Sequence, residues 1–377
     1  MNRIMSSGVP IHLWLDSLEP SALEQVKNLS KLPFAEHCIA IMPDCHTGYG
    51  MPIGSVLAAK NVVVPNAVGV DIGCGMLFMV TTLKVADCDL KDIMGRTREV
   101  IPVGHSWHNE SQGDLPNLPC TDVVSKLLVE AERQLGTLGG GNHFIEFQES
   151  DGYLCVMIHS GSRNLGKKVA DHYNQLAKAL NLSYFSKVDP AVDLAFMPVN
   201  TQEGHDYITD MNYCIAFAKM NRALMMDRIR TILDINWSNY ETEDVCHNYA
   251  RYENHMGTNV MIHRKGAISA REGEICIIPG SQGSKSYIGT GKGRAESLMS
   301  CSHGAGRVMS RTAAKTNLNL AAEIKLLDDM GVIHSIRSQS DLDEAPSAYK
   351  DIEDVMRLQS DLVEITTELT PLGVIKG

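Results

Sequence analysis

The first third of the chain alternates short apolar runs with glycine-rich turns. The runs are IAIM (39–42), SVLAA (55–59), NVVV (61–64) and MLFMV (76–80). Apolar runs of this length between turn residues are typical of buried β-strands joined by tight loops. The pattern returns later, where we expect strands that run into Gly/Ser loops at LCVMIHSGSRN (154–164) and EICIIPGSQGS (274–284).

Longer segments with helical spacing lie between and after these strands. Thr121 is placed to cap a helix over 121–135, and a stretch rich in Met, Ala and Leu predicts a long helix over 206–235. Near the end, residues 328–371 alternate acidic stretches with a segment of helical pattern over 347–365, and the acidic residues of this part are most simply a solvated face. No repeat, low-complexity tract or long linker divides the chain, so we favour one domain over residues 1–377.

Composition narrows the class of protein. The chain has 377 residues, of which 44% are hydrophobic and 21% are charged, and these values are typical of a folded globular protein. It has no apolar run long enough to cross a bilayer, and its first residues lack the apolar core of a secretory signal, so we expect a cytoplasmic protein without a membrane partner. The ten cysteines form no C-x-x-C pair, and we expect reduced thiols, with Cys74 as the one candidate ligand.

The net charge of −11 argues against a protein that coats nucleic acid, but the charge is unevenly distributed. Residues 263–315 hold nine Lys or Arg and three Glu, whereas residues 316–377 hold twelve acidic and five basic residues. A basic segment rich in glycine loops suits selective phosphate binding, although a solvated surface would have the same composition.

Five separated segments concentrate residues that bind metals. They are MPDCHTGYGMPIG (42–54), VGVDIGCGM (68–76), LGGGNHFIE (138–146), MIHSGSRNLG (157–166) and DVCHNYA (244–250). A turn among the glycines of the second segment can point Asp71 and Cys74 to the same side, and His143, His159 and His247 can add imidazole nitrogens. This mixed set predicts a metal site but leaves zinc and manganese open. Alternatively, Asp71 caps backbone amides in a turn.

The basic segment contains a second group of candidates, in HRKGAIS (263–269), PGSQGSKSYIGTG (279–291) and CSHGAGRVMSR (301–311). Its loops can cradle phosphate, but none matches the Walker pattern, which disfavours a P-loop enzyme. His303 is a candidate nucleophile next to exposed amides, and Arg307 and Arg311 would share one face if a helix began after Gly306. The structural alternative is a loop-capping histidine beside surface arginines.

These segments resemble the RtcB family of RNA-splicing ligases. The resemblance rests on MPDCHTGYGMPIG, VGVDIGCGM, LGGGNHFIE, HSGSRNLG, HNYA, HRKGA, PGSQGSKSY, SHGAGR and the final KG, in the family's order over nearly the whole chain. It implies an α+β fold with one large domain, in which mixed β-sheets surround a deep metal cleft flanked by helices. It also implies a GTP-dependent RNA ligase.

The resemblance assigns roles motif by motif. His303 becomes the guanylylated nucleophile. Arg163, Arg307 and Arg311 become candidates for RNA phosphate contacts. The ligands of two Mn²⁺ ions would be Asp71, Cys74, His143, His159 and His247, with Cys74 between the ions. The guanylate site would consist of Asn142, His143, Phe144, Ile145, Glu146, His247, Asn248, Pro279, Gly280, Ser281, Gln282, Ser286, His303, Gly304, Ala305, Gly306 and Lys376.

The family's reaction joins an RNA 3′-phosphate or 2′,3′-cyclic phosphate end to a 5′-hydroxyl end, through a histidine-GMP intermediate and an RNA-ppG end. The implied partners are such RNA ends, GTP and an archease-like activator or release-factor-like partner, and we expect a monomer that acts in RNA repair or tRNA splicing. Two rivals remain at this stage. One is a metal-dependent phosphoesterase that does not ligate, and the other is a noncatalytic RNA-binding subunit.

Overall fold

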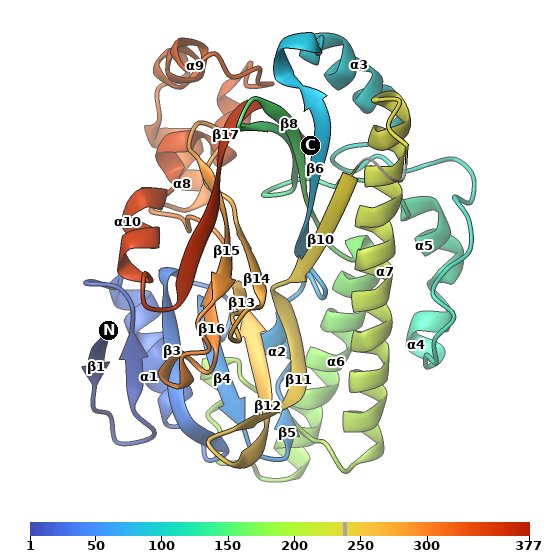
Figure 1. Ribbon diagram of the computed structural model, residues 1–377. Coiled ribbons are helices and arrows are strands. Elements are labelled where there is room, and N and C mark those ends of the chain that lie inside the picture. Colours follow the sequence, from blue (N-terminus) through green and yellow to red (C-terminus); the bar gives the residue numbers. More distant parts are fainter. Residues whose placement is uncertain (237–239) are drawn as a thin grey trace.

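The computed structural model describes residues 1–236 and 240–377 (Figure 1). Two large sheets form its centre. The first has six strands in the order β1 (Asn2–Ile4), β2 (Ile11–Leu13), β3 (Ala35–His46), β4 (Ile53–Ala59), β12 (Thr258–Lys265) and β11 (Asn248–His255). In this sheet β2 and β3 are parallel and all other neighbours are antiparallel.

The second sheet is antiparallel throughout. Its seven strands follow the order β10 (Tyr240–Cys246), β6 (Gly75–Lys84), β8 (Tyr153–Ser160), β7 (Phe144–Ser150), β17 (Val363–Lys376), β15 (Ser286–Gly291) and β14 (Ile275–Ile278). Two short pairs complete the strands: β13 (Ala267–Ser269) with β16 (Ser300–Ser302), and β5 (Val62–Val63) with β9 (Met197–Pro198).

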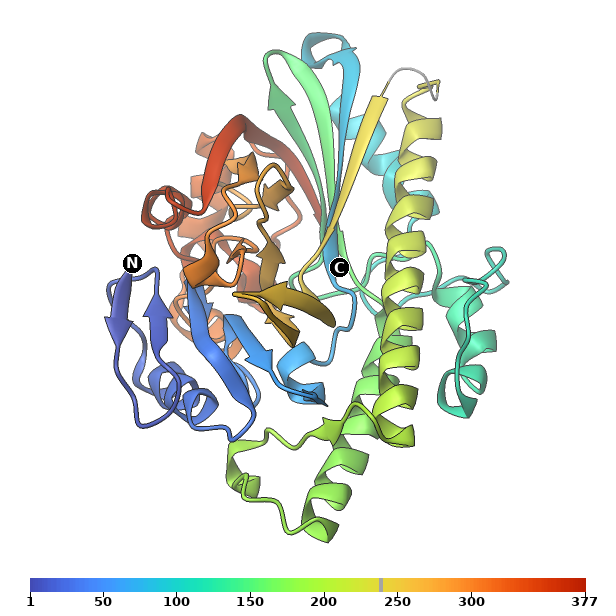
Figure 2. The same cartoon turned by 60° about the horizontal axis from the view of Figure 1, so that its bottom comes forward.

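Helices flank the sheets on two sides, as Figures 1 and 2 show. The long helices α6 (Arg163–Ser183) and α7 (Gln202–Ile232) run side by side on one flank, and α8 (Arg311–Asn317), α9 (Leu320–Asp329) and α10 (Ile352–Leu358) lie on the other. The remaining helices are α1 (Pro20–Ser30), α2 (Pro65–Val68), α3 (Leu90–Val100), α4 (Asp122–Ser125) and α5 (Leu128–Gln134). The expected α+β fold is confirmed.

Helix α7 joins the cores of the two sheets. Phe217 packs in the apolar cluster that contains Ile39 of β3, whereas Met225 and Ile229 pack with Ile158 of β8. The Thr201 side chain caps the helix by accepting a hydrogen bond from the Gly204 amide at 3.2 Å. Because one continuous helix buries apolar residues against both sheets, it helps hold them in a fixed relation.

The apolar runs of the first third are strands, as predicted, in β3, β4, β5 and β6. The long helix predicted over 206–235 is α7, and the strands predicted at 154–164 and 274–284 are β8 and β14. Thr121 does cap a helix, accepting from the Val123 amide at 3.1 Å, but the predicted helix over 121–135 breaks into α4 and α5.

The helix predicted over 347–365 is wrong for most of its length. Only α10 is α-helical there, and from Val363 the chain forms β17, the fifth strand in the order of the seven-stranded sheet. The physical reason is pairing on both edges, with β15 on one side and β7 on the other, which outweighs local helical spacing. Among the described residues, no helix combines the length and apolar character needed to span a bilayer.

Candidate active site

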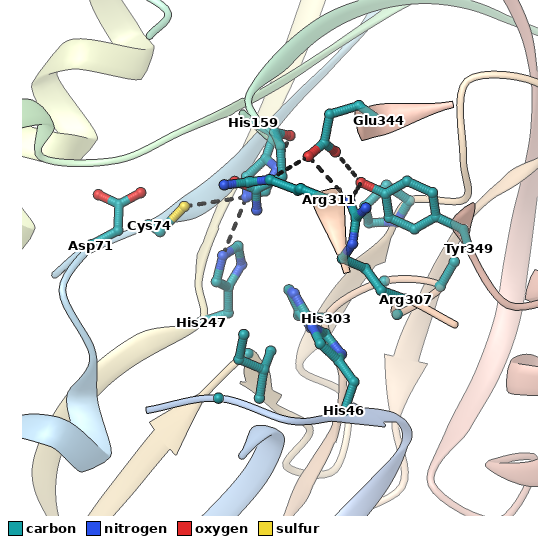
Figure 3. A pocket seen from close by; sticks show the side chains of 18 of the residues that line it. His46, Asp71, Cys74, His159, His247, His303, Arg307, Arg311, Glu344 and Tyr349 are labelled. Carbon is teal, nitrogen blue, oxygen red and sulfur yellow. Dashed lines mark hydrogen bonds and ion pairs between the residues drawn. The ribbon is translucent and has the colours of Figure 1, made fainter. Parts of the chain in front are cut away.

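A cavity of about 700 Å³ is lined by residues from both large sheets and from the loops that follow β14 and β16. Segments far apart in the sequence meet at its wall (Figure 3). The predicted site residues that line it are Asp71, Cys74, Asn142, Phe144, Glu146, His159, His247, Asn248, Pro279, Gly280, Ser281, Gln282, His303, Gly304, Ala305, Gly306, Arg307, Arg311 and Lys376. The structure therefore brings together most of the residues that the motifs singled out.

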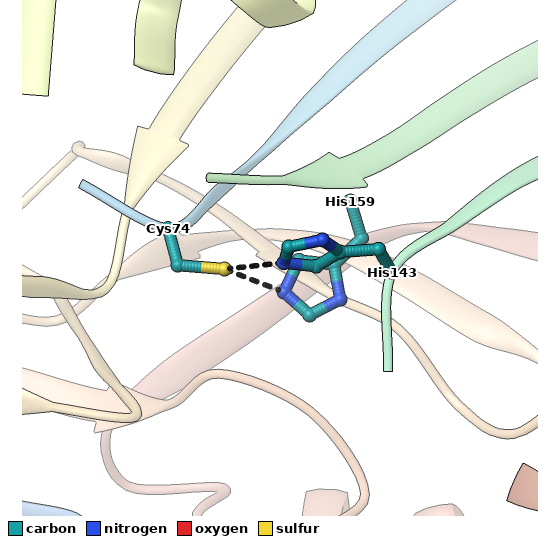
Figure 4. A group of neighbouring side chains, drawn as sticks. All are labelled: Cys74, His143 and His159. Carbon is teal, nitrogen blue, oxygen red and sulfur yellow. Dashed lines mark hydrogen bonds between the residues drawn. The ribbon is translucent and has the colours of Figure 1, made fainter. Parts of the chain in front are cut away.

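Cys74, His143 and His159 form a compact buried group (Figure 4). Cys74 directly precedes β6, His143 directly precedes β7, and His159 lies near the end of β8. The Cys74 Sγ lies 3.2 Å from Nε2 of His159 and 3.5 Å from Nε2 of His143, and one ligand atom from each residue lies within 4.8 Å of the others. A thiol and two imidazoles at this spacing can hold one divalent ion.

The two remaining predicted ligands adjoin this group. The Asp71 Oδ2 atom lies 2.8 Å from Nε2 of His143, and the Nε2 atoms of His247 and His159 are 3.3 Å apart. The five predicted ligands are thus contiguous, with Asp71 at one end and His247 at the other, and we call these five residues the metal-ligand group. Because the ligands follow one another in a chain of contacts and do not surround a single point, they suit a site that holds more than one ion.

Backbone carbonyls orient two of the imidazoles. The Nδ1 atom of His143 lies 3.1 Å from the Leu138 carbonyl oxygen, and Nδ1 of His159 lies 3.0 Å from that of Asn142. A carbonyl oxygen only accepts, so Nδ1 of His159 carries the proton and donates. In a neutral ring, Nε2 then keeps its lone pair for a metal, which is the usual arrangement behind metal-binding histidines.

Burial favours the uncharged forms of two of the imidazoles and of the thiol in the free protein. It lowers the pKa of His159 well below its usual range, with a further effect from His143, and it lowers that of His247 in the same way, helped by His303. Burial, reinforced by Asp71, raises the pKa of the Cys74 thiol well above its usual value. Nδ1 of His247 is buried and has no hydrogen-bond partner among the described residues. A bound cation would take up the lone pairs of these nitrogen and sulfur atoms, and its binding would release the thiol proton.

His303 follows β16 and is held by a carboxylate. Its backbone amide donates to Oδ2 of Asp44 at 3.1 Å, and its Nδ1 donates to the same oxygen at 2.7 Å. Asp44 is fully buried within β3. The loop approaches β3 so closely that a Cβ on Gly306, at φ +74°, would lie 2.1 Å from the Asp44 carbonyl oxygen, so glycine is needed there. Asp44 directs Nε2 of His303 away from itself, and the His303 and His247 ring centroids are 4.8 Å apart.

Asp44 has no assigned role in the sequence prediction, although it lies in MPDCHTGYG. A single acidic residue inside an apolar run signals a buried polar contact, but its partner is 259 residues away along the chain. Only the tertiary structure could reveal the pair.

Glu344 lies on another wall of the cavity (Figure 3). We call its three cationic neighbours Arg307, Arg311 and Lys376 the cation wall. The Glu344 carboxylate accepts from Nη1 of Arg307 at 3.2 Å and from Nε of Arg311 at 2.9 Å, and it lies 3.5 Å from the Lys376 ammonium. The Tyr349 hydroxyl donates to the same carboxylate. Burial opposes ionisation of Glu344, but Lys376 and Arg311 outweigh it and lower its pKa to about 2.

These contacts correct two expectations about the acidic segment and the arginines. Glu344 is only 3% exposed, so this acid is not part of a solvated face. Helix α8 begins at Arg311, so no helix places Arg307 and Arg311 on one face. The two side chains meet instead because both approach Glu344.

Four predicted residues do not line the cavity, and one of them, His143, belongs to the buried ligand group described above. Ile145 points into the apolar core beneath β7, as strand alternation requires when Phe144 and Glu146 face the cavity. Ser286 is buried behind the loop 279–284, where its hydroxyl accepts from the Gly280 amide at 3.2 Å. Arg163 lies behind the metal-ligand group, with Nη1 3.2 Å from Nδ1 of His143.

Glu146 lies on the cavity wall and is 3% exposed. The amide of Gln148 donates to its carboxylate at 2.5 Å and to the Ser286 hydroxyl at 3.0 Å. Burial raises the pKa of Glu146 to about 8, although the hydrogen bond from Gln148 opposes the shift. A carboxyl group that stays protonated near neutral pH both donates and accepts hydrogen bonds.

The fold and the site together define an α+β protein with a buried thiol and imidazole metal site beside a histidine held by a carboxylate. Comparison with known proteins then identifies the family to which this chain belongs. The chain matches the family model described as tRNA-splicing ligase RtcB over residues 25–115 and 105–377.

The RNA-splicing ligase RtcB of Escherichia coli K12 is 36% identical over 99% of both chains. The tRNA-splicing ligase RtcB of Archaeoglobus fulgidus is 32% identical over 96% of this chain and 92% of its own. The RNA-splicing ligase RtcB homolog 1 of Entamoeba dispar is 31% identical over 95% of this chain and 82% of its own. The chain belongs to the RtcB family.

Proposed function

We propose that this protein is an RNA ligase that uses GTP and Mn²⁺ to join RNA 3′-phosphate or 2′,3′-cyclic phosphate ends to 5′-hydroxyl ends. Family membership and the printed names of the relatives support RNA ligation. The geometry of His303 supports the finer mechanism. We further propose that the protein acts as a cytoplasmic monomer on cleaved tRNA or ribosomal RNA, or in tRNA splicing, with an archease-like or release-factor-like partner.

The observation that carries the mechanism is the bond between His303 and Asp44. Because Nδ1 of His303 donates to Oδ2 of Asp44 at 2.7 Å, the neutral ring keeps its lone pair on Nε2. The carboxylate also stabilises the ring as it becomes cationic during nucleophilic attack. His303 lines the cavity beside His247, so a phosphate bound near the metal ligands would lie within reach of this nitrogen.

The residues present fit two divalent ions. A thiol, three imidazoles and a carboxylate are contiguous, and the buried Nδ1 of His247 lacks a hydrogen-bond partner in the described part of the chain. Asp71, Cys74, His143, His159 and His247 would hold the ions. When bound, Mn²⁺ would neutralise charge on phosphoryl oxygens and stabilise the charge that builds there during transfer.

The reaction then uses the chain's own groups. The Nε2 atom of His303 attacks the α-phosphate of GTP, a nitrogen–phosphorus bond forms, and pyrophosphate leaves. Hydrolysis opens a 2′,3′-cyclic phosphate to a 3′-phosphate, whose oxygen attacks the His303-bound phosphate and takes GMP as RNA-ppG. A 5′-hydroxyl attacks the RNA phosphate, GMP leaves, and the phosphodiester bond forms.

The other cavity residues would position these substrates. Glu146, Lys376 and the loop 279–284 would surround the guanylate, since all of them line the cavity together with Gly304, Ala305 and Gly306. Arg307 and Arg311 would contact RNA phosphates, because guanidinium groups bind phosphate through paired hydrogen bonds. Arg163 would act on RNA only from behind His143, so its proposed role is the least direct.

The test is covalent labelling. Purified protein is incubated with α-³²P-GTP and Mn²⁺, and the label on the denatured chain is measured for wild type, His303→Ala and the control His205→Ala, which alters an exposed histidine of α7. We expect acid-labile, alkali-stable label on wild type and His205→Ala, and none on His303→Ala. Absence of label on metal-loaded wild type, with cyclic-phosphate opening that survives His303→Ala, would instead establish a phosphoesterase.

A further inference from the structure

Three large apolar side chains on the cavity wall are exposed. They are Tyr49 (77% exposed), Val70 (45%) and Val308 (53%), and they come from three separate loops. Single exposed apolar residues are common on protein surfaces, but several around the mouth of one cavity mark a binding surface. We call Tyr49, Val70 and Val308 the apolar rim.

The backbone that carries Tyr49 is fixed by its neighbours. The Thr47 amide donates to Oε1 of Glu19 at 2.6 Å. The Gln25 side chain donates to the Gly48 carbonyl at 2.5 Å and accepts from the Gly48 amide at 3.2 Å. The turn therefore has little freedom to lose when a ligand binds, which lowers the entropy cost of contact.

Lys265 ties Tyr49 to the loop that carries Val70. Its ammonium donates to the carbonyl oxygens of Tyr49 at 2.7 Å and Asn66 at 3.0 Å, and its aliphatic carbons pack against Gly69. Tyr49 and Val70 consequently lie on one side of the cavity mouth. Lys265 is itself buried, so it holds these loops and does not cover the Tyr49 ring.

The side chain of Tyr49 makes no polar or aromatic contact within the described part of the protein. Among residues 1–236 and 240–377, its hydroxyl has no hydrogen bond and its ring has no aromatic or cationic neighbour in contact, although the backbone beside it is held on several sides. A rigid turn that presents a free aromatic ring is a feature of surfaces on which flat ligands stack.

Charge decides which ligand fits. Val308 directly follows Arg307, whose guanidinium faces Glu344, and Arg311 and Lys376 lie on the same wall. One cavity therefore combines an apolar rim with a cluster of cations. A ligand with phosphates and flat rings matches both features, and a single-stranded RNA end has them in adjacent positions.

We propose that Tyr49, with Val70 beside it, is a stacking site for an unpaired nucleobase of the RNA end that enters the cavity. The inference rests on the proposed RNA ligase function and adds a subsite to it. The base can belong to the 3′-phosphate strand or to the 5′-hydroxyl strand. The site prefers single-stranded ends, because a paired and stacked terminal base has no free face for the ring.

The first experiment measures binding without catalysis. Fluorescence anisotropy is recorded for oligoribonucleotides with a 3′-phosphate or a 5′-hydroxyl, each with a normal or an abasic terminal nucleotide. The proteins are wild type, Tyr49→Ala, Tyr49→Phe and the control Phe185→Ala, which removes a 92% exposed ring outside the cavity. We expect Tyr49→Ala to weaken binding of one normal oligonucleotide about tenfold, within the range for one stacked base. Tyr49→Phe and Phe185→Ala should stay within about twofold of wild type.

The abasic substrate completes the test. Wild type should bind the relevant abasic oligonucleotide about as weakly as Tyr49→Ala binds the normal one, and combining both changes should cause little further loss. The oligonucleotide that shows this non-additivity identifies the strand. Equal binding of normal and abasic ends by wild type, with no effect of Tyr49→Ala, would overturn the proposal.

GTP labelling and RNA binding together show whether a failure concerns the stacking site or the proposed ligase function, and ligation rates are compared on that basis. Rates are normalised to the fraction of each protein that His303 labelling with GTP shows to be active, so a folding defect does not enter the comparison. Loss of labelling in wild type would end the ligase proposal, while the anisotropy series would still report on the stacking site. Normal labelling with unchanged RNA binding by Tyr49→Ala would end only the stacking proposal.

Discussion

The metal-ligand group and the cation wall lie in the same cavity but are stabilised in opposite ways. Cys74, His143, His159 and His247 are buried and contact one another through their ligand atoms, and one buried nitrogen of His247 lacks a partner among the described residues. The cation wall, by contrast, is already neutralised in part by the Glu344 carboxylate, which is itself an integral part of the protein.

The two regions therefore differ in how much their stability and side-chain order depend on a bound ligand. The metal-ligand group has donor atoms that only an ion can satisfy together, so its energetics should change greatly on metal binding. The cation wall is paired without any ligand, so its side chains are ordered before a phosphate arrives and the cost of ordering them is already met. The following predictions test this contrast, from the largest expected effect to the smallest.

Under the proposed mechanism Cys74→Ala should abolish ligation, with a loss of at least about 1,000-fold, because a divalent ion bound there would contribute several kcal/mol to phosphoryl transfer. Wild type at 100 times the metal Kd should gain about 2.7 kcal/mol of unfolding free energy, and the variant should lose much of that gain. Denaturant unfolding with and without Mn²⁺ measures this, with Cys155→Ala, a buried thiol of β8, as the control. Equal stabilisation of Cys74→Ala and wild type would contradict the ligand assignment.

Glu344→Ala should lower the free energy of unfolding by about 3 kcal/mol, because it leaves Arg307 and Lys376, whose side chains are only 14% exposed, without their carboxylate. Glu368→Ala is the control, since its ion pair with Lys285 is exposed on both sides and should contribute less than about 1 kcal/mol. Urea midpoints at constant m value give both numbers. A Glu344→Ala effect as small as that of the control would show that the cation wall does not depend on Glu344.

Glu146→Gln should flatten the pH dependence of stability in the free protein. The folded-state pKa of about 8 lies above the ordinary value of 4.5, so the native state keeps a proton that the unfolded chain releases. Wild-type stability should therefore fall as the pH rises from 4.5 to 8, by at most about 1.4 kcal/mol per pH unit. Thermal or urea unfolding across this range checks it, and an unchanged slope in Glu146→Gln would refute the assignment.

Local pattern predicted the strands and the longest helix well, and it failed where neighbours decide. The runs in β3, β4 and β6 are apolar enough to be buried wherever the chain places them. The last strand, β17, has mixed exposure along its length and forms because β15 and β7 pair with it on both sides. A local reading cannot detect pairing partners that lie far away in the chain.

The candidate site shows the same division. Motifs identified Cys74, His143, His159, His247 and His303, because ligand and nucleophile residue types stand out beside glycines. They did not identify Asp44 or the role of Glu344, and they gave no reason to separate Arg163 from Arg307. Each of these depends on a contact between distant segments, and carboxylates and arginines are common on every protein surface.

The sequence by itself determined which chemistry is available: a thiol, several imidazoles and a reactive histidine in one reduced, globular chain, with motifs specific enough to define the family. The tertiary structure decided which of these groups meet, that Asp44 holds His303, that Glu344 orders the cation wall, and that Tyr49 stays exposed at the cavity mouth. The physical reason is that residue type and local spacing set the chemistry of a group, whereas its pKa, orientation and partners depend on burial and on contacts that the fold alone creates.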